Sequence, residues 1–274
     1  MKIIDAHLHL FDPSEPGGEN LARRVGHHNS TEHLRQVYGE LDMAHGVVMG
    51  NRSLEAGYHN YPTDLFHYCV GLDSFLLRDS GRPIPDLADL VEENLRRESC
   101  CGVKLYPGYH KIRLSDPQYR PIYELAARYD KPVAVHMGLT SMPQAHLKYS
   151  HPLALDEVAA DHPDTRFVMC HFGNPFFDAA TAVLAKNPNV FTDLSGFWEG
   201  RVDLERYCRE QAGYVFLLKS WLAAVNRWDS LMFGTDWPIV NLGEYIAFIQ
   251  RLIPEEHWEN VFFHNANRIY GLGL

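Results

Sequence analysis

The sequence lacks the features of a nucleic-acid-binding or membrane-spanning protein. Its 25 Lys and Arg residues are outnumbered by 35 Asp and Glu residues, which gives a formal net charge of −10. Nucleic-acid binding depends on clustered Lys and Arg, so this balance argues against it. No run of about 18 apolar residues could cross a bilayer, and no basic segment followed by an apolar one opens the chain. We therefore expect a cytoplasmic protein without nucleic-acid or membrane partners.

Paired cysteines are also absent. The cysteines show no CxxC spacing and are odd in number: Cys69, Cys100, Cys101, Cys170 and Cys208. This pattern is typical of reduced thiols buried in a cytosolic protein. Cys170 stands next to His171, but alternation along a strand predicts that the two side chains point to opposite faces. We therefore do not expect Cys170 to act as a nucleophile.

Short β-branched segments alternate with helical segments along the chain, without a linker, a low-complexity tract or an internal repeat. This alternation is typical of βα units and a parallel sheet. We predict strands at residues 2–9, 46–50, 68–72, 102–106, 132–136, 166–171, 189–194 and 231–236. Helices are predicted at residues 31–44, after an N-cap at Asp86, at 121–129, 152–160 and 179–186, and as a pair within 204–225. Eight strands close a barrel of about 250 residues, so we predict one (β/α)8 TIM barrel domain over residues 1–274.

The sequence does contain metal-ligand residue types at the ends of its predicted strands. His7 and His9 follow the apolar segment 3–6 and point the same way, because side chains alternate along a strand. Later strands end in His136, His171 and Asp236. In an eight-stranded α/β barrel, the active site lies on the rim formed by the C-terminal strand ends. These five residues are therefore predicted to meet at one rim of the barrel.

This set of residues suits a zinc ion with an open coordination position. Three His and one carboxylate favour Zn²⁺, with Mn²⁺ as the alternative. We assign one divalent ion to His7, His9, His136 and Asp236. Such an ion would lower the pKa of bound water from about 15.7 toward 7. His171 is interpreted either as a ligand of a second metal ion or as a neutral base and hydrogen-bond donor beside the first.

Seven segments in order resemble the amidohydrolase superfamily. They resemble in particular its amidohydrolase-related branch, which includes aminocarboxymuconate-semialdehyde and resorcylate decarboxylases and lactone hydrolases. The segments cover nearly the whole chain and are IIDAHLHL, GVKLYPG, YELAARYDKPVAVHMG, HPLALDEVAADHPDTRFVMCHFGNP, NVFTDLSG, LMFGTDWP and HNANRIYGL. The resemblance implies that one metal ion is held by His7, His9, His136 and Asp236. It also implies that His171 acts in catalysis.

Lys104 ends the fourth predicted strand, and its interpretation stays open. It either pairs with a carboxylate of the substrate or is carboxylated and bridges two metal ions, as a strand-four lysine does in two-metal members of the superfamily. Carboxylation needs a neutral lysine, whereas the usual pKa of lysine is about 10.4. We favour the contact with substrate, and we predict further substrate contacts from Tyr106, Ser195 and Trp237.

Two features near the N-terminus can also bear on the site. Asp5 is predicted to share the inward face of the first strand with His7 and His9. There it would secure barrel packing or a hydrogen bond behind the metal ligands. The loop at residues 11–29 is either a flap over the site or an ordered surface loop.

The reaction that these residues favour is hydrolysis of a small carboxylate-bearing lactone, ester or amide by metal-activated water. In this reaction Asp236 takes a proton from the water, and His171 stabilises the developing oxyanion. The alternative is a metal-dependent non-oxidative decarboxylase of a small aromatic or unsaturated acid. A third interpretation is a non-catalytic binding barrel. The compact chain favours the hydrolase, and the partner is expected to be a small anionic molecule. Assembly into a homo-oligomer is compatible with either reaction.

Overall fold

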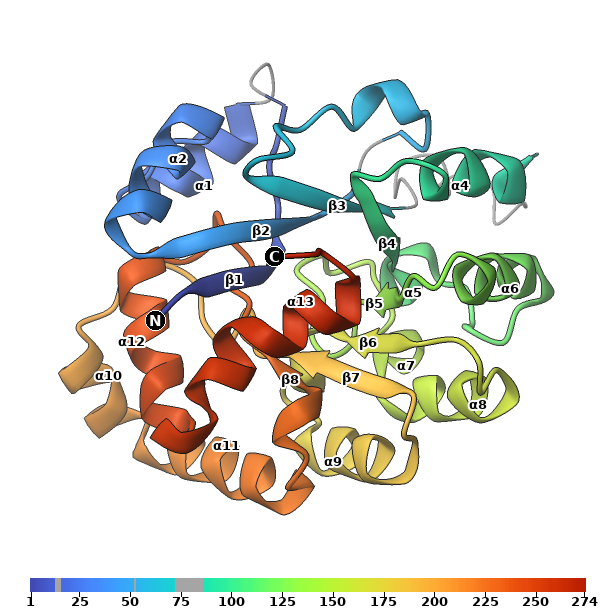
Figure 1. Ribbon diagram of the computed structural model, residues 1–274. Coiled ribbons are helices and arrows are strands. Elements are labelled where there is room, and N and C mark those ends of the chain that lie inside the picture. The colour runs from blue at the N-terminus through green and yellow to red at the C-terminus, as the bar shows by residue number, and fades with distance from the viewer. Residues whose placement is uncertain (13–15, 52, 72–85) are drawn as a thin grey trace.

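Eight parallel strands follow one another in chain order around one sheet of the computed structural model (Figure 1). The structure describes residues 1–12, 16–51, 53–71 and 86–274. The strands are β1 (Ile3–Leu8), β2 (Met43–Met49), β3 (Phe66–Gly71), β4 (Cys100–Leu105), β5 (Val133–Val135), β6 (Phe167–Met169), β7 (Val190–Asp193) and β8 (Leu231–Met232). Residue 72, the predicted end of the third strand, lies outside the described residues. All eight predicted strands are present, although their bounds differ.

The sheet closes where β1 meets the chain that follows β8. The Ala6 amide donates to the Phe233 carbonyl at 2.9 Å, and the Asp236 amide donates to the His7 carbonyl at 2.8 Å. A further bond runs from the His9 amide to the Trp237 carbonyl at 2.7 Å. These bonds join the last strand to the first, and the fold is the predicted (β/α)8 barrel.

Helices surround the ring of strands (Figure 1). They are α1 (Pro16–Arg24), α2 (Thr31–Glu40), α4 (Leu87–Leu95), α5 (Pro107–His110), α6 (Arg120–Arg128), α7 (Leu147–Ser150), α8 (Leu153–Asp161), α9 (Phe177–Lys186), α10 (Leu204–Glu210), α11 (Ala212–Val225), α12 (Leu242–Leu252) and α13 (Asn265–Tyr270). The predicted pair within 204–225 is confirmed as α10 and α11. The predicted helix 31–44 ends earlier, because Met43 already begins β2. Asp86 precedes α4, but the predicted cap is wrong, because its side chain makes no capping hydrogen bond.

Helix α13 closes one end of the barrel. Its side chains Ile269 and Tyr270 pack in one cluster with the inward-facing Ile4, Ala6 and Val168. Figure 1 shows α13 lying across the centre of the ring of strands. With this end filled by apolar side chains, the strand ends that carry the polar residues form the other rim.

Within the described part of the chain, no helix combines the length and the apolar character needed to cross a membrane.

Strand β1 does not alternate regularly up to His9. Ile4 and Ala6 lie in the interior cluster, and the pairing of β1 with β2 shifts register between Asp5 and Leu8. Asp5 therefore faces away from the interior, and the prediction that it shares a face with His7 and His9 is wrong. Its carboxylate instead accepts hydrogen bonds from the amide of Thr235 at 2.9 Å and from its hydroxyl at 2.6 Å. Asp5 thus fastens β1 to the loop that carries Asp236.

Strands β6 and β8 end before the residues that were predicted to finish them. Regular strand ends at Met169 and at Met232, and His171 and Asp236 adopt left-handed backbone conformations with φ of 62° and 63°. Such a conformation costs a residue with a side chain roughly 1–2 kcal/mol and is concentrated at functional sites. Turns rather than strands therefore aim these two side chains.

Candidate metal centre

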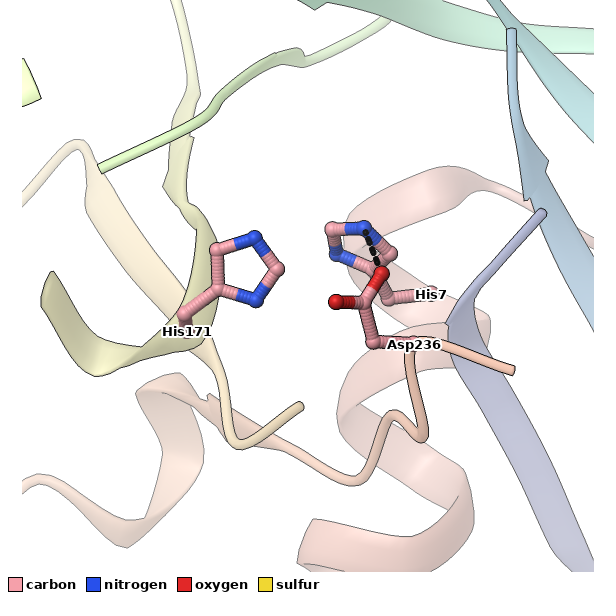
Figure 2. A group of neighbouring side chains, drawn as sticks. All are labelled: His7, His171 and Asp236. Carbon is pink, nitrogen blue, oxygen red and sulfur yellow. Dashed lines mark ion pairs between the residues drawn. The ribbon is translucent and has the colours of Figure 1, made fainter. Parts of the chain in front are cut away.

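The five residues predicted to meet at the rim are neighbours in the structure. Nε2 of His7 and Nε2 of His9 lie 3.4 and 3.2 Å from the same oxygen, Oδ1 of Asp236. Nε2 of His171 lies 3.1 Å from Nδ1 of His136. Figure 2 shows His7 and His171 beside the Asp236 carboxylate. Residues from β1 and from the turns after β5, β6 and β8 thus form one centre.

Each of three imidazole rings is held from behind by an acceptor. Nδ1 of His7 lies 2.9 Å from a carboxylate oxygen of Asp193, and Nδ1 of His9 lies 3.0 Å from the Met49 carbonyl. Nε2 of His136 lies 2.7 Å from the Leu139 carbonyl. A carbonyl or carboxylate oxygen only accepts hydrogen bonds, so the nitrogen facing it must carry the proton. In a neutral imidazole the other nitrogen then has a free lone pair.

Burial keeps the rings of His7 and His136 neutral when no metal is bound. It lowers the pKa of His7 to about 4 and holds the pKa of His136 well below its usual value. Burial also acts to raise the pKa of Asp236, but the facing imidazoles of His171, His9 and His7 outweigh it and hold that pKa well below the usual range. At neutral pH the centre therefore contains the uncharged imidazoles of His7 and His136 beside an ionised carboxylate.

The lone pairs point at one another without a hydrogen between them. Nε2 of His7 is buried and has no hydrogen-bond partner among the described residues. Nitrogen and oxygen atoms of His7, His171 and Asp236 all lie within 4.8 Å of one another. Converging acceptors repel unless a cation lies between them. Imidazole nitrogen and carboxylate oxygen are ligands that suit Zn²⁺ and similar divalent ions, so these donors fit a metal ion.

The grouping of donor atoms in the structure differs from the ligand set assigned from the sequence. His7, His171 and Asp236 form one group of candidate metal ligands, with donor atoms within 4.8 Å of one another, whereas the sequence assigned His136 to the metal and His171 to catalysis. His9 shares the Asp236 oxygen with His7, and His136 adjoins the ring of His171. Assignment of the ion to His7, His9, His136 and Asp236 therefore stays a prediction.

A pocket of about 610 Å³ opens onto this centre. Its floor contains His9, His136, His171 and Asp236, and its walls include Phe11, Leu21, Asn51, Tyr106, Tyr109, Leu139, Asn174, Phe197 and Trp198. Phe11 and Leu21 belong to the segment predicted as a loop at 11–29. That segment instead contains helix α1, and its residues 13–15 lie outside the described chain. Aromatic and aliphatic side chains thus surround a polar floor.

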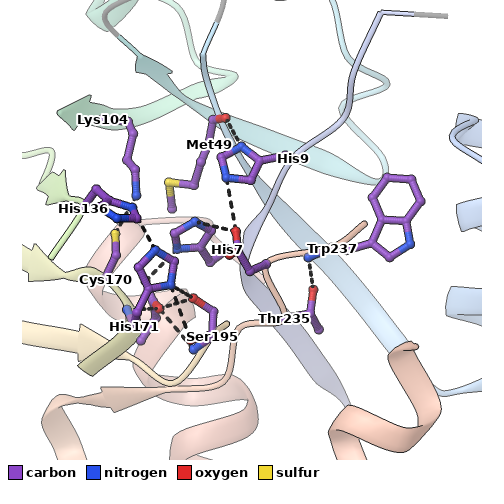
Figure 3. A network of polar contacts seen from close by, with 12 residues as sticks. His7, His9, Met49, Lys104, His136, Cys170, His171, Ser195, Thr235 and Trp237 are labelled. Carbon is purple, nitrogen blue, oxygen red and sulfur yellow. Dashed lines mark hydrogen bonds and ion pairs between the residues drawn. The ribbon is translucent and has the colours of Figure 1, made fainter. Parts of the chain in front are cut away.

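Of the four predicted substrate contacts, only Tyr106 lines the pocket. Lys104 is fully buried, and its ammonium lies 2.7 Å from the Cys170 thiol. Ser195 is fully buried beside His171, and Trp237 is buried and points away from the histidines (Figure 3). The positions of Lys104, Ser195 and Trp237 therefore give no support for contact with a substrate in this pocket.

Cys170 faces the barrel interior, contrary to the prediction. It lies in the interior cluster with Val168, two residues earlier, and near His7 and Asp193. Alternation therefore extends to Cys170, and the left-handed turn at His171 brings the His171 side chain to the same centre. Burial holds the pKa of its thiol well above the usual value. Cys170 is thus a protonated thiol at neutral pH, which agrees with the prediction that it is not a nucleophile.

Sequence reasoning missed the function of Asp193 and most of the pocket wall. Asp193 ends β7, as the other site residues end or follow their strands, so its position was a usable signal. Asn51, Tyr109 and Asn174 lie on loops, where no periodic pattern marks them.

Gly196 brings the backbone against the centre, and its replacement by alanine is expected to be harmful. Its φ is +66°, and a Cβ there would lie 3.0 Å from both Asp236 Oδ2 and His171 Nδ1. We expect Gly196→Ala to lower the free energy of unfolding by about 1–2 kcal/mol, measured by urea denaturation of the metal-free protein. Gly39→Ala in α2 meets open space and should stabilise by about 0.5–1 kcal/mol. Equal effects of the two substitutions would contradict this account.

Comparison with known proteins agrees with the fold. The family model described as Amidohydrolase matches residues 4–272. No curated protein sequence matches the chain.

Solved structures with the same fold cover nearly the whole chain. An uncharacterized TIM-barrel protein from Bordetella bronchiseptica is 20% identical, with a TM-score of 0.73 and 99% of each chain covered. 2,6-Dihydroxybenzoate decarboxylase from Rhizobium is 14% identical, with a TM-score of 0.67 and 100% of each chain covered. A probable 2-pyrone-4,6-dicarboxylic acid hydrolase from Acinetobacter baumannii is 14% identical, with a TM-score of 0.63, covering 99% of this chain and 100% of its own. At these identities the likeness concerns the fold.

Proposed function

Because the chain belongs to the amidohydrolase family, we propose that it is a metal-dependent hydrolase of a small lactone, ester or amide. One observation carries the proposal: buried imidazole lone pairs converge on the ionised Asp236 carboxylate at the floor of a pocket. A purely structural histidine cluster would be expected to share protons between its rings, whereas here the protons point outward to Asp193, Met49 and Leu139.

His7, His9, His136 and Asp236 would hold the ion. Three imidazoles and one carboxylate favour Zn²⁺, with Mn²⁺ as the alternative. When bound, a divalent ion supplies a Lewis acid that polarises a carbonyl and lowers the pKa of water toward 7. The ring nitrogens that face backbone carbonyls and Asp193 fix the orientation of these imidazoles, as outer partners of metal ligands commonly do.

Side chains of the protein then accept protons and position the substrate. Water that attacks a carbonyl loses a proton, and the Asp236 carboxylate is placed at the pocket floor to accept it. His171 lies on the same floor and is assigned to catalysis. The aromatic walls formed by Tyr106, Phe197 and Trp198 exclude water and suit a planar or ring-shaped substrate.

Lys104 provides no evidence that the substrate carries a negative charge. That lysine was the expected partner of a substrate carboxylate, but it lies buried against Cys170. Among the described residues, no Lys or Arg side chain lines the pocket. We therefore base the substrate class on the susceptible carbonyl and the ring, and a carboxylate on the substrate would have to be bound by the metal ion or by polar groups such as Asn51 and Asn174.

Decarboxylation of an aromatic or unsaturated acid is the second candidate function. The same floor could bind a carboxylate to the metal ion, and the aromatic wall suits an aromatic ring. The structurally similar Rhizobium protein is a decarboxylase, and the similar Acinetobacter protein is described as a probable hydrolase. The fold thus accommodates both reactions.

Labelled water separates the two reactions. Protein reconstituted with Zn²⁺ is incubated in ¹⁸O water with lactones, esters, amides and aromatic acids, and the products are examined by mass spectrometry. We expect one ¹⁸O atom in the product acid, because hydrolysis adds solvent oxygen to the cleaved carbonyl. Release of CO₂ with no label in the remaining product would replace hydrolysis by decarboxylation.

A further inference from the structure

Asp193 holds two parts of the site with one carboxylate. Its Oδ2 lies 2.9 Å from Nδ1 of His7. Its Oδ1 accepts hydrogen bonds from the amide of His171 at 2.9 Å, the amide of Ser195 at 3.2 Å and the hydroxyl of Ser195 at 2.5 Å. The side chains of Asp193 and Ser195 are fully buried, so water does not compete for these bonds. Figure 3 shows Ser195 beside His171.

The Ser195 hydroxyl can only accept a hydrogen bond from His171. A serine hydroxyl has one hydrogen, and here it is donated to Asp193 Oδ1. Oδ1 also receives two backbone amides, which are obligatory donors, so it acts as an acceptor. Nδ1 of His171 lies 2.8 Å from the Ser195 Oγ and 3.3 Å from the Ser195 carbonyl oxygen, which also only accepts. Both neighbours of Nδ1 therefore require a proton on that nitrogen.

We propose that Ser195 and Asp193 are positioning residues that fix His171 as the Nδ1–H tautomer and turn its Nε2 lone pair toward the reaction centre. Nε2 lies 3.1 Å from Nδ1 of His136, on the side of the ring opposite to Ser195. This role of Ser195 and Asp193 rests on the proposed function, because that function makes the metal centre the place of reaction. The tautomer itself follows from the hydrogen bonds alone.

This tautomer changes the role that His171 can fill. A neutral His171 has no hydrogen on Nε2, so it cannot stabilise an oxyanion as the donor that the sequence analysis expected. It can instead accept a proton from the attacking water or bind a metal ion through Nε2. Because Asp193 also fixes Nδ1–H on His7, one carboxylate sets the tautomers of two rings that face each other across the centre, with ring centroids 4.7 Å apart.

The direct test is the histidine ¹⁵N spectrum of the metal-free full-length protein. Two-bond ¹H–¹⁵N correlations distinguish Nδ1–H from Nε2–H imidazoles, and His171→Asn identifies the His171 signals. We expect Nδ1–H for both His171 and His7. An Nε2–H tautomer at His171 overturns the proposal, and this measurement needs no substrate.

Kinetics of matched variants test the consequence. Ser195→Ala should lower kcat about 10- to 100-fold with little change in KM or zinc affinity, and Ser195→Thr should restore much of the loss. Asp193→Ala should lower zinc affinity as well, because it also releases His7. Thr192→Val is the control and should leave kcat unchanged. Among the described residues, the hydrogen bonds of this buried hydroxyl on β7 run to the carbonyls of Met169 and Asp193.

The two proposals fail in distinguishable ways. If the spectrum shows the Nδ1–H tautomer of His171 but no ester, lactone or amide is hydrolysed, the proposed function is contradicted and the tautomer assignment is retained. Hydrolysis together with an unchanged kcat in Ser195→Ala would overturn the positioning role.

Discussion

Asp236→Asn is expected to reduce kcat/KM about 1,000-fold and to weaken metal binding. The carboxylate faces His7 and His9 at 3.4 and 3.2 Å, so its loss removes both an anionic ligand and the proposed proton acceptor. An amide cannot take up the proton from attacking water. Steady-state kinetics and metal analysis of the purified variant measure the two effects.

The pH dependence of activity provides a second test of Asp236→Asn. If water ionised by the metal ion attacks the substrate, wild-type activity should rise with pH through an apparent pKa near 7. Asp236→Asn should remove this rise along with the activity. Asp229→Asn, an exposed position outside the site, is the matched control and should keep both. A variant at Asp236 that keeps wild-type activity would refute its assignment to the centre.

His171→Asn is expected to lose most of the activity while it keeps most of the metal. The loss in kcat should be about 100- to 10,000-fold, because the asparagine amide can still donate to the Ser195 hydroxyl but offers no nitrogen in place of Nε2. Zinc content after dialysis and kcat are measured on the same preparation, with the exposed His264→Asn as control.

The opposite result would reassign His171. Its atoms group with those of His7 and Asp236 within 4.8 Å, so a ligand role is geometrically available. Loss of zinc in proportion to the loss of activity would make His171 a metal ligand and favour a two-metal site. Retained activity would remove it from catalysis altogether.

Much of the fold could be predicted because each βα unit carries its own pattern. Apolar β-branched segments marked all eight strands, and five residues at or after four strand ends predicted one rim. The errors arose where the backbone leaves a regular element. Cys170 follows Val168 into the interior, and the left-handed turn then brings His171 toward the same centre. Asp5 lies between the inward-facing Ile4 and Ala6, and the register shift follows it, before Leu8. Neither irregularity has a signature in local alternation.

The candidate site was predictable in its ligands and not in its supporting contacts. Metal binding or catalysis is the main explanation for His and Asp recurring at strand ends, and this is the pattern of His7, His9, His136, His171 and Asp236. The acceptors behind the rings are mostly backbone carbonyls, those of Met49 and Leu139, and any residue type supplies a carbonyl. Lys104 was assigned to the pocket because it ends a strand, but its side chain turns to Cys170. That choice depends on packing between β4 and β6, which the sequence of either strand does not reveal.

The measurement that tests the central claim most directly is a zinc titration of the metal-stripped protein, followed by elemental analysis and by activity on the same samples. The account predicts uptake of one Zn²⁺ per chain, with activity that rises in proportion to the bound ion and is lost again on stripping. Failure to bind any divalent ion, together with undiminished activity of the stripped protein, would contradict a metal centre built from His7, His9, His136 and Asp236.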